Sequence, residues 1–189
     1  MADRDMPRDQ MPDKQLLASF AAGDRDALGE LARRYERSLL GLACGLLGGR
    51  RDLALDAVQE MWLRVIRFAR NFNGQSRVKT WLYRITINEC RALRAKIARD
   101  AKRQAASVIH VESPGKVSEE SGSDDAQRVR EAVGRLDDHR RTLVLLCYHA
   151  GMTHVQAADI LGIPLGTLKS RLHATLTHLR QSLPEEVQA

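Results

Sequence analysis

"ADILGIPLGTLKSRL", residues 158–172, places a glycine and a proline between two runs of apolar residues at helical spacing. The apolar side chains before this break share one side of a first helix, and they are Val155, Ala158, Ile160 and Leu161. The leucines after it recur every three or four residues along a second helix, at Leu165, Leu168, Leu172, Leu176 and Leu179. Gly162 suits the left-handed turn that ends the first helix, and Pro164 suits the first turn of the second. The stretch therefore predicts a helix-turn-helix.

Polar residues mark the start of the first helix and the outer face of the second. Thr153 stands three residues before Gln156, as in a capping box. The face of the second helix away from the leucines contains Thr167, Lys169, Ser170, Arg171 and His173. Such a face fits the major groove, where Arg and Lys read base edges and hydroxyls bind phosphates. An ordinary helical hairpin with solvated cations is the alternative, but the short glycine turn and a face without acids favour DNA binding.

The composition of the 189-residue chain favours an all-α protein of one or two domains, because alternating β-branched residues are hardly seen. Lys and Arg number 30 against 24 Asp and Glu, which gives a net charge of +6 and suggests an anionic partner. Twelve cations and two acids lie between Arg64 and Arg103, so the positive charge is concentrated there. This clustering favours nucleic acid, although a basic helix can also rest on anionic lipid.

The composition also argues against several function classes. No run of 18 apolar residues exists and the first ten residues, "MADRDMPRDQ", are too charged for a signal peptide, so we expect no membrane insertion and a cytoplasmic protein. Cys44, Cys90 and Cys147 form no CxxC pair and are expected to be reduced. The histidines near them and beyond lack a fourth ligand at familiar spacing, so we expect no zinc and no cofactor; they are His149, His154, His173 and His178.

Changes in composition along the chain predict its domains. Residues 104–125 end in "VESPGKVSEESGSDD", which is acidic, rich in serine and poor in large apolar groups, and therefore predicts a flexible acidic linker. It joins two small helical domains, 13–103 and 126–183, of which the second contains the helix-turn-helix. We expect residues 1–12 to be disordered and residues 184–189 to form a short tail.

Two helices are predicted in the first part of the N-terminal domain. "DRDALGELARRYERSLLGLACGLLG", residues 24–48, begins with a cap at Asp24 and carries a core-facing stripe of leucines. "DLALDAVQEMWLRVIRFARNF", residues 52–72, is predicted to bury Val58, Met61 or Trp62, Val65, Ala69 and Phe72. Its other side carries Asp56, Gln59, Glu60, Leu63 and Arg64. Leu63 marks either a partner surface or a singly exposed leucine, which needs no explanation.

A third helix is predicted from Val78 onward. Its apolar face includes Trp81, Leu82, Ile85 and Leu93, and another face carries Arg84, Asn88, Arg91 and Lys96. The segment before it, "NFNGQSRVK", residues 71–79, is polar and basic. Aromatic residues gather around it, namely Trp62, Phe68, Phe72, Trp81 and Tyr83. Aromatics beside cations suit the binding of single-stranded bases, but aromatics at helical spacing also commonly fill cores.

Three stretches together carry a family resemblance. They are "DAVQEMWLRV" (56–65), "WLYRITINECRALRAK" (81–96) and "GMTHVQAADILGIPLGTLKSRLHATLTHLR" (151–180). In their order and spacing the chain resembles the extracytoplasmic-function (ECF) sigma factors of the sigma-70 family. The resemblance implies a dissociable subunit, not an enzyme, that binds core RNA polymerase, recognises the minus-thirty-five and minus-ten promoter elements and promotes DNA melting by trapping a flipped base.

The resemblance also implies roles for individual residues. Those matching the polymerase-docking helix are Asp56, Gln59, Glu60 and Leu63. Those matching the loop that captures a base of the melted non-template strand are Asn73, Gly74, Gln75, Ser76, Arg77 and Lys79, followed on the minus-ten helix by Trp81, Arg84, Asn88, Arg91 and Arg94. Those matching the minus-thirty-five contacts on duplex DNA are Thr153, Gly166, Thr167, Lys169, Ser170, Arg171 and His173. An anti-sigma factor is a further candidate partner, and we expect the free chain to be monomeric.

Departures from the family and competing functions remain. After the recognition motif the family usually continues with basic residues, whereas Ala174, Thr175 and His178 stand here, which predicts a shallower salt dependence. The main alternative function is a freestanding helix-turn-helix regulator that dimerises through its N-terminal domain and binds a palindrome. A nuclease or recombinase would need a metal cluster, and Asp52, Asp56 and Glu60 offer only one acidic face with no second cluster opposite.

Overall fold

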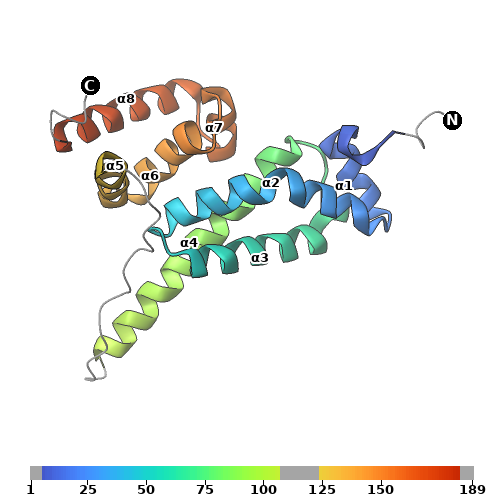
Figure 1. Ribbon diagram of the computed structural model, residues 1–189, viewed down its shortest axis with the longest axis horizontal. Coiled ribbons are helices and arrows are strands. Elements are labelled where there is room, and N and C mark those ends of the chain that lie inside the picture. The colour runs from blue at the N-terminus through green and yellow to red at the C-terminus, as the bar shows by residue number, and fades with distance from the viewer. Residues whose placement is uncertain (1–5, 107–123, 184–189) are drawn as a thin grey trace.

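The computed structural model describes residues 6–106 and 124–183, and within these ranges the chain is helical without a β-strand (Figure 1). The first half contains α1 (Asp13–Ala21), α2 (Arg25–Leu46), α3 (Arg51–Phe68) and α4 (Val78–Ala106), with 3-10 turns at Arg8–Gln10 and Ala69–Asn71. The second half contains α5 (Asp124–Arg135), α6 (Asp138–Val144), a π-helix (Leu145–His149), α7 (His154–Leu161) and α8 (Leu165–Ser182). The all-α prediction is confirmed.

The predicted linker, 104–125, overlaps the ends of two helices. Helix α4 continues to Ala106 and α5 begins at Asp124, so both ends of that range are helical. The remaining residues of the range, 107–123, lie outside the described residues, as does the predicted tail, 184–189. No helix in the described part of the chain is both long and apolar enough to cross a bilayer.

The N-terminal core is formed by the apolar stripes of α2, α3 and α4. Asp24 caps α2 as predicted, with its side chain accepting a hydrogen bond from the Asp26 backbone at 3.1 Å. On α3, Met61 rather than Trp62 is fully buried, beside Val58, Val65 and Ala69. Fully or nearly fully buried partners come from the other two helices, namely Leu31, Leu39, Leu42, Leu82 and Tyr83. This core fixes α4 against α3 and sets the direction of its outer face.

The expectation of disorder over residues 1–12 is wrong for residues 6–12. Arg34 of α2 donates to the carbonyl oxygens of Arg8, Asp9 and Met11 at 2.8–2.9 Å, which holds this segment on the helix bundle. Arg34 and its neighbour Arg33 also donate to Glu30, and these bonds lower the pKa of the Glu30 carboxyl to about 2. The segment is therefore ordered by long-range contacts that its own charged sequence does not reveal.

The helix-turn-helix has the predicted caps. Thr153 accepts a hydrogen bond from the Gln156 backbone while the Gln156 side chain accepts one from the Thr153 backbone, which confirms the capping box. Gly162 ends α7 in the left-handed region with φ of 66°, and Pro164 stands immediately before α8. Both helices pack mainly through residues beyond their first turns, such as Ile160 on α7 and Leu168 on α8.

The prediction of buried stripes is wrong for two apolar residues. Val155 is 63% exposed and Leu165 is 37% exposed, although both continue the apolar pattern of their helices. Each lies in the first turn of its helix, ahead of the buried stretch that starts at Ala157 or Leu168. A periodic pattern fixes the side of a helix that faces the core, but not the length of helix that the neighbours cover.

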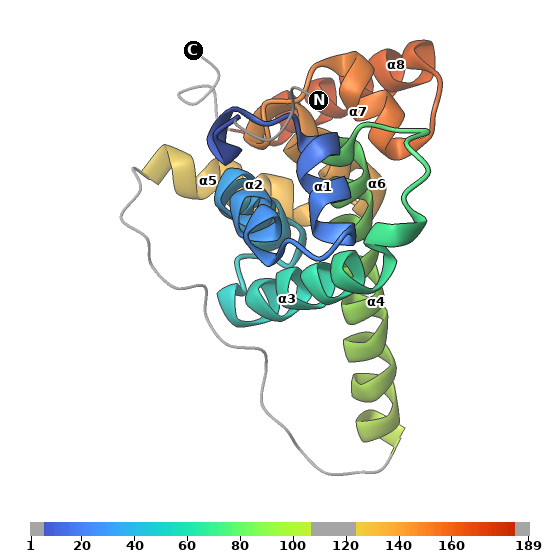
Figure 2. The ribbon, with the colours of Figure 1, turned by 90° about the vertical axis from the view of Figure 1, so that its right-hand side faces the viewer.

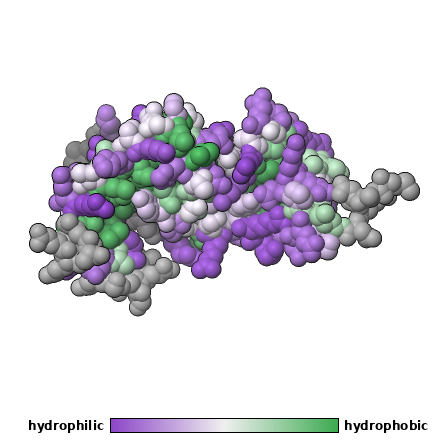
Figure 3. Space-filling model, turned by 90° about the horizontal axis from the view of Figure 1, so that it is seen from above, coloured by the Kyte–Doolittle hydropathy of each residue, from purple (hydrophilic) through white to green (hydrophobic). Residues whose placement is uncertain are grey.

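The two halves share one apolar core, as the close packing of α4 and α2 against the second half indicates (Figure 1). Gly41 and Gly45 of α2 face the π-helix, and a Cβ atom at Gly45 would lie 2.8 Å from Leu145 Cδ1. At Gly41 a Cβ atom would collide with the imidazole of His149. The two missing side chains therefore let the second half approach the backbone of α2. Seen from above, the described surface is mostly hydrophilic with scattered apolar patches (Figure 3).

Candidate nucleic-acid interface

The predicted base-capture residues from Asn73 to Arg77 form a short loop before α4, and Lys79 lies in the first turn of that helix. Asn73 accepts a hydrogen bond from the Gln75 backbone at 3.1 Å, and Gly74 adopts a positive φ of 71°. Gly74, Gln75 and Arg77 are exposed, while Ser76 and Lys79 are half-buried. Because the Asn73 side chain holds the turn, the polar groups of the loop stay close to one conformation.

Aromatic residues beside the loop divide between two roles. Phe72 and Trp81 lie in contact, with ring centroids 5.2 Å apart and planes tilted by 49°, and both are half-buried. Tyr83 is almost wholly buried and belongs to the core, where burial raises the pKa of its hydroxyl. Of these three rings, the Phe72–Trp81 pair therefore remains within reach of a base stacked from outside.

A cavity of about 610 Å³ adjoins the loop. Its lining combines the loop with Asp13, Lys14 and Tyr35 of the first two helices. The second half supplies the remaining wall through Met152, Gln156, Asp159 and Ile160. The cavity has the polar donors and the size to receive a nucleotide base, and α7 covers one side of it.

The arginines of α4 point toward the second half and are paired there. Arg84 donates to Asp159 Oδ1 at 3.1 Å and to the Ile160 carbonyl oxygen at 3.2 Å. Thr80 also donates to Asp159, at 3.0 Å. Asp159 therefore ties the first turns of α4 to the C-terminal end of α7.

A second carboxylate holds the next two arginines. Arg91 Nε lies 2.9 Å from Asp138 Oδ2, and Arg94 pairs with the other oxygen of the same carboxylate. Asn88, one turn before Arg91 on the helix, is exposed. Three predicted minus-ten arginines are thus occupied by anionic groups of the same chain, in the manner in which they would bind phosphates.

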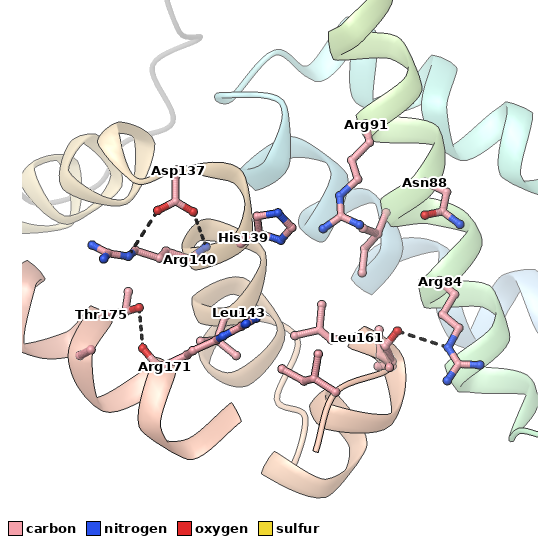
Figure 4. A pocket seen from close by; sticks show the side chains of 15 residues that line it. Arg84, Asn88, Arg91, Asp137, His139, Arg140, Leu143, Leu161, Arg171 and Thr175 are labelled. Carbon is pink, nitrogen blue, oxygen red and sulfur yellow. Dashed lines mark hydrogen bonds and ion pairs between the residues drawn. The ribbon is translucent and has the colours of Figure 1, made fainter. Parts of the chain in front are cut away.

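Arg84, Asn88 and Arg91 border a larger cavity between the two halves, of about 670 Å³ (Figure 4). Figure 4 shows Arg84, Asn88 and Arg91 along α4 on one side and Arg171 of α8 on the other. The lining includes apolar residues, with Leu143 and Leu161 among them. The predicted minus-ten helix and part of the predicted minus-thirty-five helix therefore face one space in this structure.

The predicted recognition face of α8 is largely open. Lys169, Ser170, Arg171 and His173 are exposed together with Gly166, whereas Thr167 is half-buried. Among the described residues no acid pairs with Lys169 or Arg171. Thr175 is buried and donates to the Arg171 carbonyl oxygen at 2.7 Å, so it serves the helix and could not contact a phosphate.

The predicted polymerase residues lie on the outer face of α3. Asp56, Gln59 and Glu60 are exposed and Leu63 is half-buried. Leu55 and Ile66, which the sequence reasoning missed, are 49% and 48% exposed along this helix. Leu55 lies four residues before Gln59 and Ile66 lies three residues after Leu63, so each shares a helix face with a predicted polymerase residue. This spacing is the sequence signal that could have identified them. In Figures 1 and 2, α3 lies on the side of the molecule away from α7 and α8.

Sequence reasoning also missed Asp138 and Asp159. Each stands in a charged or polar stretch with nothing local to distinguish it, and its partner lies more than 40 residues earlier. Only the packing of the two halves brings these acids to the arginines of α4.

Comparison with known proteins identifies both halves of the chain. The family described as Sigma-70 region 2 matches residues 31–100, and Sigma-70 region 4 matches residues 126–179. The ECF RNA polymerase sigma factor SigM of Mycobacterium tuberculosis is 32% identical over 165 residues, covering 87% of this chain and 81% of the relative. The ECF RNA polymerase sigma-E factor of Haemophilus influenzae is 28% identical, covering 87% of this chain and 91% of the relative.

A solved structure agrees with these matches. The sigma factor RpoE of Bartonella quintana, in complex with the anti-sigma factor NepR, superposes with a TM-score of 0.67 at 25% identity. The similarity covers 82% of this chain and 95% of that chain, so it extends over both halves.

Proposed function

The chain belongs to the ECF RNA polymerase sigma factors of the sigma-70 family, and from this premise we propose how its residues divide the work of initiation. It binds core RNA polymerase, recognises the minus-thirty-five and minus-ten promoter elements and promotes DNA melting. The proposed domain for polymerase and the minus-ten element is 13–103, and the proposed domain for the minus-thirty-five element is 126–183. The proposed role is that of an initiation factor with no reaction of its own, acting in the cytoplasm with its polymerase.

The loop of residues 73–79 receives the flipped base of the minus-ten element. The turn at Asn73 and the adjoining cavity support this role, because a preformed site avoids part of the ordering cost of binding. Unstacking a base costs a few kcal/mol, and contacts to Gln75, Arg77 and the half-buried Trp81 would offset this cost. Arg84, Asn88, Arg91 and Arg94 then bind the upstream edge of the same element.

The C-terminal domain reads the minus-thirty-five element through α8. Its exposed Lys169, Ser170 and Arg171 support this role, because helix N-terminal halves in a helix-turn-helix approach base edges in the major groove. The proposed contact of Thr153, which is exposed at the start of α7, is a backbone phosphate. The absence of acids along residues 164–180 leaves the face wholly neutral or positive.

The two DNA contacts require the halves to separate. A guanidinium of Arg84 or Arg91 that is held by Asp159 or Asp138 is not available to a phosphate at the same time. Docking on polymerase therefore precedes promoter binding, through the α3 face of Asp56, Gln59, Glu60 and Leu63, which the second half leaves uncovered. The observation that carries the proposal is the combination of an uncovered α3 face with α4 arginines that are paired to acids of the second half.

An anti-sigma factor is the proposed regulator, by analogy with the Bartonella quintana protein, which was solved with one. The free chain is proposed to be monomeric, since its buried apolar residues gather mainly in one core that the two halves share.

Run-off transcription with purified core polymerase on host promoter fragments tests the division of roles. The variant D56K/E60K reverses two exposed charges on α3, and we expect it to lose promoter-selective transcripts while keeping its helical content. The matched control is E36K/E131K, which reverses two exposed acids elsewhere. Equal activity of both variants would refute the α3 docking face, and a specific footprint without polymerase would instead support a freestanding regulator.

A further inference from the structure

Helix α4 extends well beyond the domain that it helps to build. Its packing against the core ends near Leu93 and Arg94, and from Ala95 to Arg103 every residue is exposed except the half-buried Asp100. Figures 1 and 2 show this distal part projecting away from the bundle with no other labelled helix beside it. A helix without packing partners buries little apolar surface, so its exposed residues are free to serve another purpose.

The distal part continues the face of α4 that carries the minus-ten residues. Eleven residues make about three helical turns, so Arg99 lies on the same side as Asn88 and Lys102 on the same side as Arg91. Lys96 borders this side. Between these positions stand the exposed alanines Ala92, Ala95 and Ala98, which would let a partner approach the helix backbone closely.

The described part of the chain offers no acidic partner to this surface. Within it, no acid pairs with Lys96, Arg99 or Lys102. Asp100, the single acid from residue 90 to residue 106, lies one turn after Lys96 at the edge of this face, and its carboxylate pairs with Arg103 at 3.8 Å. Compensation of the helix dipole would account for cations in the last turn, but Lys96 and Arg99 lie about two turns or more before Ala106.

We propose that Lys96, Arg99 and Lys102 form a distal basic face that binds phosphates of the duplex between the two promoter elements, just upstream of the minus-ten element. The contact reads no sequence, because the face consists of long cationic side chains and alanines. From Arg91 to Lys102 the helix rises about 16 Å, which corresponds to about five base pairs of duplex. The proposal rests on the proposed function in one respect, namely that α4 runs from the melted bases toward upstream DNA.

The test uses the wild-type holoenzyme and the variant K96A/R99A/K102A on a promoter that the wild type selects. Alanine is the best helix former, so α4 is expected to stay intact, which circular dichroism checks. The matched control R25A/R37A/R135A removes three exposed charges from α2 and α5. Binding is measured over a series of salt concentrations on natural DNA and on DNA whose phosphates over the five base pairs upstream of the minus-ten element are neutral methylphosphonates.

We expect the distal variant to lower the slope of log affinity against log salt by up to about 2.7, or about 0.9 for each phosphate that the protein no longer neutralises. The wild type on methylphosphonate DNA should behave like the variant on natural DNA. The variant on methylphosphonate DNA should show little further change in affinity or salt slope. An unchanged slope overturns the proposal, as does an equal effect of the control. The proposal is also overturned if the substitutions reduce affinity on methylphosphonate DNA as much as they do on natural DNA. That result would point to a protein partner, such as a polymerase surface.

The outcome separates this proposal from the proposed function. A wild-type holoenzyme that forms no promoter complex refutes both. A wild type that binds selectively while the distal variant matches it in affinity and salt slope refutes only the distal face.

Discussion

Arg91 and Asp138 form an ion pair of 2.9 Å across 47 residues of sequence. The same carboxylate pairs with Arg94, and Asp159 holds Arg84 in the same way. Three of the residues that we propose for minus-ten binding, Arg84, Arg91 and Arg94, therefore also join the two halves of the chain. Domain closure and promoter binding compete for one set of positive charges.

Removing both carboxylates should loosen this closure. For the variant D138N/D159N we expect a larger radius of gyration by small-angle X-ray scattering, because the α4 arginines lose their charged partners. The pairs are 31–49% exposed, and such pairs contribute only about 0.2–1 kcal/mol each, so added salt should expand the wild type as well. The control D26N/D125N removes two acids that pair with Arg8 and Arg128, each within its own half of the chain, and an expansion of the same size there would contradict the prediction.

The glycines of α2 offer a steric test of the same interface. Gly45→Leu introduces a side chain into Leu145 and should cost about 1–3 kcal/mol of overpacking, which thermal unfolding would register as a lower Tm. At Gly29, in the same helix, a Cβ atom would meet nothing within 4 Å, so Gly29→Leu should gain up to about 1 kcal/mol from helix propensity. If both substitutions raise the Tm equally, the close approach of the π-helix to Gly45 is not maintained in solution.

The cap at Thr153 should matter for the whole recognition domain. Thr153→Ala removes the acceptor for the Gln156 backbone and should destabilise the protein by about 1 kcal/mol. Thr153→Ser keeps the hydroxyl and should stay close to the wild type in urea unfolding. A serine variant as unstable as the alanine variant would show that the methyl group, rather than the capping bond, carries the effect.

Glu30 should make stability depend on pH in the acid range. Its folded pKa is about 2, below the ordinary 4.5, because Arg33 and Arg34 donate to its carboxylate. A depressed carboxyl pKa stabilises the fold above about pH 4.5, and this contribution is lost as the pH falls toward 2. Glu30→Gln should therefore lower the free energy of unfolding near neutral pH and flatten its fall between pH 4.5 and 2 in urea titrations.

The matched control is Glu36→Gln, which removes a charge from the same helix without removing a bond to Arg33 or Arg34. The wild-type pH dependence should persist in that variant. An equally flattened curve for both variants would assign the effect to net charge instead of to the Glu30 carboxylate.

Features governed by neighbouring residues were predictable from the sequence. The turn at Gly162, the capping box at Thr153, the cap at Asp24 and the start of α4 at Val78 all follow from residues within one helical turn of each other. The helix-turn-helix was predictable because its two stripes and its break are contiguous. The roles of the site residues came from family resemblance and stay predictions.

Features governed by distant contacts were not predictable in this way. The pairing of Asp138 and Asp159 with α4, and the approach of Leu145 to Gly45, depend on how the two halves pack, which no local pattern encodes. The exposure of Val155 has the same cause, because it depends on where a neighbouring helix ends. Order in residues 6–12 likewise depends on Arg34, far along the chain.

The continuity of α4 has a consequence for insertions and deletions. One added residue between Arg94 and Arg99 would turn everything beyond it by about 100°, and would carry Arg99 and Lys102 away from the side that bears Asn88. The fold would tolerate this, since the distal part packs on no other described helix. Length changes in this helix should therefore be neutral for folding yet harmful to promoter affinity, unless they restore the angular phase, as an addition of about eleven residues would.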